Sequence, residues 1–487
     1  MNIIDKVISV VAPSWSVRRM KSRYLEHVYQ EGIRKYDAAT KKIRGGGYNP
    51  AKTGPNTDIA TQGNILVSRS RDMTRNNPYA WRASRVVPAN VVNGGIKIAI
   101  KHSSMETANA AKEIWKEWAD EVICDFDEDL NFAGIQRLIT RSVRESGEVF
   151  VRQRRVKEGI GLQLQILESD FLDTGRDGEK LSNGNEIIQG IEFNSQGKKV
   201  AYWLFEQHPS DNRLWTNLNS IRVPAKQILH IFYKLRPGQI RGIPFGPAAM
   251  LKLKDFDEYE DANLIRQKIA ACFSVFVTDT EDPRPGEISD QSDFPIERVE
   301  PGIIEHMGPN KEITLAQPPT VDNYGEYSSS IMQGVAAGYD LSYEQLTNDY
   351  SKVNFSSGRM GWLENDKLIS EFQNEVIINQ LCKPVFKWFV TAAFLKGKVD
   401  SDIKATWTAP KRQMLDPLKE SKGTKEMVGG HLYSWQGAVR DLGRNPDEVF
   451  EEIVEDHQRF AEAGIPMDMS VKPSVERDDD DDTSSNN

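Results

Sequence analysis

The sequence predicts an α+β protein that is mainly helical. Apolar side chains recur every three or four residues on both sides of a central block, which is typical of helices packed on a core. Inside that block, residues 150–233, the apolar period changes to two, and turn pairs such as Asn183-Gly184 separate the runs. The chain has 487 residues, of which 39% are hydrophobic. That length allows two or three domains or one large elongated fold.

The two ends of the chain carry opposite charge. Residues 1–50 hold ten Lys or Arg against four Asp or Glu. We expect residues 1–64 to form a basic mobile arm, with order beginning near Ile65. The far end, residues 474–487, contains the run Asp478–Asp482. Runs of like charge usually stay solvated, so the sequence predicts an acidic disordered tail there.

The first ordered part is expected to combine helices with one short strand. Helical periodicity covers Arg69–Val92, interrupted by Pro78 and Pro88. Ile96–Ile100 alternates between apolar and polar residues, as a short strand does. Met105–Ala119 returns to the helical period.

The central block begins after a well-marked helix. Apolar spacing places this helix at about Asn131–Ser146, with Asn131 as its N-cap and Gly147 as its end. The alternating runs that follow predict strands. The strand candidates are Val149–Arg154, Leu162–Leu167, Ile187–Phe193, Val200–Phe205 and Gln227–Tyr233.

A Gly- and Pro-rich joint, Arg236–Pro247, connects the block to a long helix. A helix over Pro247–Phe273 would measure roughly 40 Å at 1.5 Å per residue. Its apolar residues form one narrow stripe and its other faces are charged, which favours packing against another helix in an assembly. A strand at Val275–Val277 and a helix rich in small residues, Tyr324–Tyr339, follow.

A loop of aromatic, amide and small residues, Leu341–Asn354, precedes the last long helix. That helix is predicted from about Ser356 to Leu395, with a kink before Pro384. Short polar helices are expected after residue 410. The loop has no apolar periodicity, so it is either an ordinary surface turn or a loop that faces a ligand, and its residues do not decide between the two.

The chain lacks the residue patterns of an active site or a metal centre. Its seven histidines show no HxxxH or HExxH spacing, and its three cysteines lie more than 100 residues apart. Gly46–Thr53 has Ala51 where a phosphate-binding loop needs glycine. The acidic run Asp125–Asp129 lacks EF-hand spacing and precedes a helix, where negative charge is favourable. We therefore expect no catalytic residue, no metal and no cofactor.

The charge and hydropathy exclude two classes of partner. A net charge of −9 argues against a sequence-specific DNA-binding protein, because such proteins are usually basic. No run approaches the 18 apolar residues that a membrane helix needs, so no membrane partner is expected.

Several segments, taken in order, resemble the lambda family of tailed-phage portal proteins. Each segment alone is weak, but the collinear set is specific and covers roughly residues 65–465. The residues that carry the resemblance are RSRDMTRNNPYAWRA (Arg69–Ala83), FAGIQRLITRSVRESGEVFVR (Phe132–Arg152), LQILESDFLDT (Leu164–Thr174), VPAKQILHIF (Val223–Phe232), RPGQIRGIPFGPAAM (Arg236–Met250), LSYEQLTNDYSKVNFSSGRMG (Leu341–Gly361), DPLKE (Asp416–Glu420) and the Gly443–Val449 region.

The resemblance implies a mainly helical portal fold that assembles as a ring. The parts that it implies are the N-terminal wing (65–130), a stem helix (131–149), a β-rich clip (150–233), the joint and a second stem helix (234–273), the C-terminal wing (274–340), the tunnel loop (341–355), a long kinked helix of wing and crown (356–409) and the helical crown (410–473).

The resemblance also implies a structural role and a set of partners. The ring would be a homo-oligomer, dodecameric at a capsid vertex, through which the terminase motor packages double-stranded DNA and through which DNA exits. The implied protein partners are the terminase large subunit, the major capsid and scaffold proteins, and the head-completion or tail adaptor proteins. The protein would be part of the virion, and would lie in the host cytoplasm during assembly.

The resemblance to portal proteins gives three groups of candidate site residues. For the tunnel loop facing DNA they are Asn348, Asp349, Tyr350, Ser351, Lys352, Val353 and Asn354. For the stem and channel they are Lys252, Lys254, Asp255, Arg266 and Lys268. For the joint between clip and stem they are Arg236, Pro237, Gly238, Arg241 and Gly242.

Two other functions remain open at this point. One is a metal-dependent enzyme that processes nucleic acid, with magnesium held by Asp125–Asp129 or by Asp170 and Asp173. It is disfavoured because those carboxylates lack a partnered acid or base and a basic substrate groove. The other is a soluble ring-forming adaptor.

Overall fold

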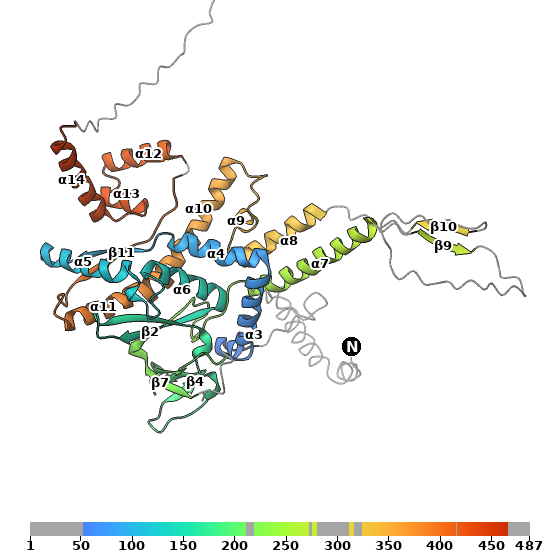
Figure 1. Ribbon diagram of the computed structural model, residues 1–487, viewed down its shortest axis with the longest axis horizontal. Helices are drawn as coiled ribbons and strands as arrows, with labels where there is room; N and C mark the ends of the chain where they lie inside the picture. Colours follow the sequence, from blue (N-terminus) through green and yellow to red (C-terminus); the bar gives the residue numbers. More distant parts are fainter. Residues whose placement is uncertain are drawn as a thin grey trace, which may run out of the picture. The chain divides into compact units, whose positions relative to one another are not determined.

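The computed structural model describes residues 52–210, 219–271, 275–279, 311–315, 324–414 and 416–465 (Figure 1). The chain divides into two compact units, Met1–Thr57 and Asp58–Asn487. The architecture below is that of the second unit. The acidic tail and all of the predicted basic arm before Lys52 lie outside the described residues. The prediction of a mainly helical α+β protein is confirmed.

Two helices open the described chain, α3 (Pro55–Asn76) and α4 (Pro78–Val92). The predicted break at Pro78 is confirmed, because Asn77 caps α4 by accepting the N–H groups of Tyr79 and Ala80 at 3.0 and 3.1 Å. The predicted interruption at Pro88 is wrong, since Pro88 lies inside α4. The predicted start of order near Ile65 is also wrong, because α3 begins at Pro55.

The core joins segments from both halves of the chain. Strand β1 (Lys97–Lys101) pairs antiparallel with β11 (Lys404–Thr408), a strand that was not predicted. Helices α5 (Met105–Asp120) and α6 (Phe132–Ser146) meet α11 (Lys383–Leu395) in an aromatic cluster. Within it the ring centroid of Trp115 lies 5.5 Å from Phe132 and 4.9 Å from Phe389.

The central block forms two sheets. One has the order β3-β2-β8 and the other β4-β5-β6-β7. Their strands are β2 (Glu148–Arg155), β3 (Leu162–Leu167), β4 (Glu186–Ile188), β5 (Ile191–Phe193), β6 (Lys199–Phe205), β7 (Ser220–Pro224) and β8 (Ile228–Phe232). The single strand predicted at Ile187–Phe193 is two strands, because Gln189 and Gly190 adopt positive φ and turn the chain.

Residues 150–233, which the resemblance assigned to a β-rich clip, share a hydrophobic core with the main body. Val149 and Val151 of β2 are buried in one hydrophobic core with Ile135 of α6. On the opposite face of β2, Phe150 is buried with Tyr202 of β6 in a second core. The alternation of β2 therefore joins the block to the main body on one face and joins its two sheets on the other.

The remaining elements of the central and C-terminal parts are mostly helical. They are η2 (Val122–Cys124), η3 (Ser169–Phe171), η4 (Thr174–Arg176), η5 (Ala225–Gln227), α7 (Pro247–Ala271), β9 (Val275–Asp279), β10 (Lys311–Leu315), α8 (Tyr324–Gly338), α9 (Tyr343–Thr347), α10 (Phe355–Phe372), α12 (Pro417–Gly429), α13 (Trp435–Asp441) and α14 (Pro446–Glu462). Strands β9 and β10 pair antiparallel.

The distortion predicted before Pro384 is a π-helical segment, η6 (Gln373–Cys382), between α10 and α11. The N–H of Lys383 donates to the carbonyl of Ile378, five residues back. A proline continuing a regular α-register would clash with the carbonyl four residues before it, so a wider turn suits this position. The amide of Gln380 in η6 also exchanges two hydrogen bonds, of 3.1 and 3.0 Å, with the backbone of Phe232.

A buried ion cluster centred on Glu148 links the start of β2 to the joint. Its carboxylate accepts hydrogen bonds from Arg241 Nε (2.6 Å), the Gly242 N–H (2.7 Å) and His230 Nε2 (2.9 Å). Lys199 Nζ lies 3.3 Å from His230 Nδ1. Because a lysine ammonium can only donate, the imidazole proton is on Nε2 and is donated to Glu148.

The charge states of this cluster follow from burial and from the neighbours. Burial raises the pKa of the Glu148 carboxyl, but the charge of Arg241 and the bonds from His230 and Arg241 outweigh burial, so the net pKa lies below its usual value. Burial lowers the pKa of His230 to about 4. Burial also lowers the pKa of Lys199 to about 8. At neutral pH the cluster therefore holds a carboxylate, a guanidinium and a neutral imidazole.

Two glycines allow the backbones to approach beside this cluster. A Cβ added at Gly242 would lie 2.1 Å from the carbonyl oxygen of Gly147. A Cβ at Gly147, whose φ is +85°, would lie 2.3 Å from the carbonyl carbon of Ile243. The end of α6 and the joint therefore touch through backbone, which leaves no room for side chains at either position.

We predict that Glu148→Gln lowers the free energy of unfolding by about 3–5 kcal/mol, because the substitution leaves the Arg241 guanidinium buried without a counter-charge. Urea denaturation of the wild type and the variant measures this difference. The matched control is Glu179→Gln at a surface ion pair with Arg176, where the change should stay within about 1 kcal/mol. Equal effects of the two substitutions would contradict the structural role of Glu148.

We also predict that acid destabilises the fold partly through His230. Its folded pKa of about 4 lies below the unfolded value of about 6.5, so the unfolded state binds the extra proton and stability falls as pH drops through that window. In His230→Gln, the slope of unfolding free energy against pH should fall by up to ~1.4 kcal/mol per pH unit. The exposed His457→Gln is the control, and an unchanged slope in His230→Gln would refute the assignment.

Candidate functional site

The candidate tunnel-loop residues lie between α9 and α10, and α9 itself occupies part of the loop predicted at Leu341–Asn354. At the start of α9, Ser342 and Gln345 form a reciprocal capping box, and Asn354 and Ser357 do the same at the start of α10. Asn348 ends α9 in the left-handed conformation, with φ of 63°. We call the exposed segment between them, residues 348–354, the α9–α10 loop.

The tip of the α9–α10 loop is polar and organised by Asp349. Its carboxylate accepts the N–H of Ser351 at 3.0 Å and the hydroxyl of Tyr343 at 3.3 Å. Hydrogen bonding from Ser351 is the main cause that lowers the pKa of Asp349, and the charge of Lys352 adds to it. Asp349 is therefore ionised at neutral pH and partly offsets the charge of the exposed Lys352.

Two side chains that the sequence reasoning missed hold the base of this loop. Arg82 of α4 donates through Nε to the carbonyl of Gln345 (2.7 Å) and through Nη2 to Oδ1 of Asn348 (3.0 Å). The buried Asn365 of α10 accepts from Gln345 Nε2 at 3.0 Å and donates to the carbonyl of Asp340 at 3.3 Å. The tip is thus exposed while its base is clamped from α4 and α10.

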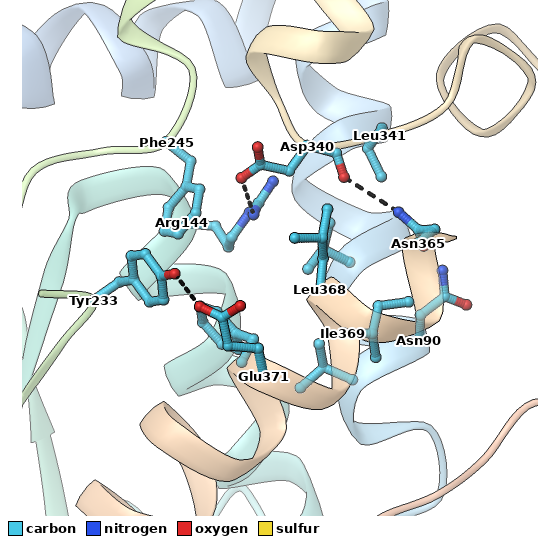
Figure 2. Close-up of a pocket in the computed structure, with 13 residues that line it drawn as sticks. Asn90, Arg144, Tyr233, Phe245, Asp340, Leu341, Asn365, Leu368, Ile369 and Glu371 are labelled. Atoms are coloured by element: carbon cyan, nitrogen blue, oxygen red, sulfur yellow. Dashed lines mark hydrogen bonds and ion pairs between the residues drawn. The ribbon is translucent and has the colours of Figure 1, made fainter. Parts of the chain in front are cut away.

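Beneath this base, Arg144 of α6 reaches the turn between α8 and α9 (Figure 2). It donates to the carbonyl of Tyr339, and its Nη1 lies 3.8 Å from the carboxylate of Asp340. Its guanidinium carbon lies 4.0 Å from the ring centroid of Phe245 in the joint. Burial lowers the pKa of Arg144 to about 10, which leaves it charged at neutral pH.

The cavity beside Arg144 is small. Its volume is about 40 Å³, and Tyr233 and Glu371 line its other side, where the tyrosine hydroxyl donates to the carboxylate (Figure 2). That hydrogen bond is the main cause that raises the pKa of Tyr233 to about 12. A space of this size suits a few water molecules and is too small for a nucleotide or an organic cofactor.

The second candidate group lies on α7, which packs antiparallel against α8 (Figure 1). Tyr259 of α7 contacts Tyr324 and Tyr327 of α8, with ring centroids 6.1 and 4.8 Å apart, and Tyr324 donates to Glu260 at 2.9 Å. At the other end of the pair, a Cβ added at Gly338 would lie 2.7 Å from the Cβ of Ala249. The small residues of α8 therefore permit close helix packing.

The predicted apolar stripe of α7 is covered along only part of its length. Leu253 and Phe256 are buried against α8 and the core, whereas Ala262 and Ile265 are exposed. The predicted stem residues Lys252, Lys254, Asp255 and Lys268 are exposed, and Arg266 is half-buried. Lys254 pairs with Glu258 at 3.3 Å. Since α7 carries five acidic and four basic residues, it has no excess of positive charge.

The joint residues divide into a buried and an exposed set. Arg241 and Gly242 are part of the buried Glu148 cluster, so they support the fold. Gly238 turns the chain with φ of +79°, and Arg236 is exposed and bonds Asp58 at 3.4 Å. The structure thus does not bring the three predicted groups together as one binding site.

Three of the carboxylates considered for magnesium, those of Asp125, Asp170 and Asp173, bind protein groups. Asp125 is buried and accepts the N–H groups of Asp129 and Leu130, so it stabilises the turn before α6. Asp170 binds Arg71 at 2.7 Å, and Asp173 binds the hydroxyl of Ser220 at 2.6 Å.

Asp170 does lie near two other candidate ligands, Glu168 and His208. Arg71 pairs with both carboxylates, at 3.1 Å to Glu168, so the guanidinium already offsets part of their negative charge. No helix of the described chain is long and apolar enough to cross a membrane.

Comparison with known proteins gives the family. The model for the lambda family of phage portal proteins matches residues 41–373, which is more than half of the chain and includes α7, α8 and the α9–α10 loop. The chain is 29% identical over 451 residues to the probable portal protein of Halomonas phage phiHAP-1, with 86% of each chain covered. It is 20% identical over 471 residues to portal protein B of Escherichia phage lambda, covering 83% of this chain and 85% of that protein.

Among solved structures, a chain in the neck of the native GTA particle is similar, with a TM-score of 0.46 and 13% identity over 78% of this chain and 93% of that chain. The match to the family model begins before α3 and ends at the first residue of η6. The alignments to the two phage relatives cover most of the chain. This protein therefore belongs to the lambda family of phage portal proteins.

Proposed function

We propose that this chain forms the portal ring at a capsid vertex, with α7, α8 and the α9–α10 loop as its channel elements. The role at the capsid vertex is proposed because the chain belongs to the portal family. The single structural observation that supports the assignment of channel elements is the antiparallel α7–α8 pair, because it is followed directly in the chain by a loop with a clamped base and an exposed tip.

The proposed stem is α7 together with α8, in place of the α6 and α7 pair implied by the sequence. Helix α6 is a core helix, since Ile135, Ile139 and Val143 are fully buried. Helices α7 and α8 instead contact each other along one face, and α7 exposes charged residues on its other faces. The proposed clip is the segment between them, residues 272–323, which includes the pair β9 and β10.

The α9–α10 loop is proposed to narrow the channel around DNA. A conduit must not hold DNA tightly, because each phosphate contact adds salt-sensitive affinity that opposes transport. The loop meets this requirement: Lys352 is its basic residue, and Asp349 lies close enough to offset part of its charge. Contacts of this kind touch the backbone and do not read bases.

The remaining parts of the proposal concern partners and place. The ring is proposed to be a dodecamer without enzymatic activity that receives DNA from the terminase large subunit. The clip would dock that motor first and the head-completion or tail adaptor proteins later, and the major capsid and scaffold proteins would surround the ring. The ring would assemble in the host cytoplasm and persist in the virion.

Light scattering and negative-stain imaging of the purified chain test the proposal. Rings with a central hole support it. A strictly monomeric protein that cleaves nucleic acid with a metal would overturn it, and a ring that never joins capsids would favour a soluble adaptor.

Lys352→Glu should leave the ring mass unchanged and lower the DNA packaged per capsid several-fold, because the substitution reverses the charge that faces the phosphates. Light scattering measures the first quantity and a nuclease-protection packaging assay the second. Lys352→Arg keeps the charge and should package normally. Normal packaging by Lys352→Glu would contradict the placement of this loop at the DNA.

Arg82→Ala should mobilise the α9–α10 loop without dissociating the ring. Hydrogen bonds from a charged donor stabilise by about 1.5–3 kcal/mol, so amide exchange of residues 348–354 should accelerate by roughly tenfold or more. Hydrogen–deuterium exchange measures this change, with Arg75→Ala on α3 as the control. Unchanged exchange in the loop would show that Arg82 does not hold its base.

A further inference from the structure

An exposed aromatic and basic surface lies across α4 and α6. We call it the Trp81 face; its residues are Trp81 and Arg85 of α4 and Arg137, Leu138 and Arg141 of α6. Trp81 is 42% exposed and Leu138 is 39% exposed. Side chains four residues apart on each helix share a face, so these residues form two adjacent stripes.

Two guanidinium groups of the Trp81 face share one indole ring. The guanidinium carbon of Arg141 lies 4.9 Å from the Trp81 ring centroid, and that of Arg85 lies 5.7 Å from it. Arg141 is also 3.5 Å from Glu145, and Arg137 donates to the carbonyl of Asn93 at 3.0 Å. Stacking occupies the face of a guanidinium and leaves N–H groups on its edge for other acceptors.

The Trp81 face is not needed to build the core. Helix α4 buries Ala80, Ala83 and Val87, and α6 buries Ile135 and Ile139, all on the opposite sides of these helices. The face carries three arginines, and Glu145 is the one acidic residue within α4 and α6. It is thus a basic surface on a chain of net charge −9.

We propose that the Trp81 face docks an acidic surface of the next copy of this chain, an inference that rests on the proposed ring. A ring needs two different complementary surfaces on every subunit, because its contacts are head-to-tail. Trp and Arg are among the residues enriched in the central contacts of interfaces, and carboxylates are bidentate partners of arginine.

Charge complementarity favours a second copy over nucleic acid as the occupant. Helix α14 carries seven acidic residues against one arginine, and three of the seven, Asp447, Asp456 and Glu462, form no ion pair within the described chain, so α14 is one acidic surface that a neighbouring copy offers. DNA binding by a protein of net charge −9 would instead have to overcome long-range repulsion. The proposal predicts that ring assembly weakens as salt rises, because salt screens the complementary charges.

Ring assembly by the full chain tests the proposal. We expect Arg85→Glu/Arg141→Glu to need at least about tenfold more protein than the wild type to form rings, measured by light scattering, because acidic surfaces would then face each other. The control Lys116→Glu/Lys398→Glu makes the same charge change at exposed sites elsewhere and should assemble as the wild type does. Trp81→Ala should weaken assembly with no change in charge.

The outcomes separate this inference from the proposed function. Monomeric wild type overturns the ring itself, and the inference with it. If the wild type forms rings and Arg85→Glu/Arg141→Glu forms them equally well, only the inference is overturned. An equal loss of ring assembly in the control Lys116→Glu/Lys398→Glu would also overturn it. If the variant unfolds, Arg85→Gln/Arg141→Gln replaces it. A variant that keeps its rings but no longer binds a short DNA duplex would assign the face to nucleic acid.

Discussion

The buried carboxylate of Glu148 is the constraint on which the arrangement of α6, the sheet β3-β2-β8 and the joint before α7 depends. It draws Arg241 and the Gly242 N–H from the joint and His230 from β8 to the first residue of β2. The contact is possible only because Gly147 and Gly242 lack side chains, so the backbones of α6 and the joint touch. Since α7 begins five residues after Gly242, this cluster also fixes where the α7–α8 pair leaves the core.

The same region supports the α9–α10 loop through polar groups that are buried and satisfied. Arg144 lies three residues before Gly147 in α6, and its side chain reaches the turn that joins α8 to α9. Arg82 and Asn365 then hold α9 from two further helices. Each of these side chains bonds a backbone carbonyl, so the base of the loop is fixed by directional contacts while its tip remains free to meet a partner.

Local patterns predicted most elements well and their partners poorly. The caps at Asn131 and Gly147 and the strand Leu162–Leu167 are visible in sequence because capping and alternation act over a few residues. Alternation in residues 150–233 shows that a strand has two faces, but not what covers each, so the packing of β2 on the main body could not be predicted. The strand at Lys404–Thr408 was missed since its partner lies about three hundred residues away. Part of the predicted loop Leu341–Asn354 is helix α9, and only residues 348–354 form the loop before α10. Arg82, Asn365 and Arg144 carry no local signal.

The sequence by itself determined the class of fold, the family through its collinear segments, the order of helices and strands, and the lack of any spacing typical of a metal or catalytic centre. These properties depend on residue types at short separations. Only the tertiary structure decided which helices pair, that α6 is a core helix while α8 packs along α7, and that Arg241 and Gly242 serve a buried ion cluster. Those outcomes depend on burial and on contacts between residues far apart in the chain, where desolvation makes a satisfied charge pair stable and an unsatisfied one costly.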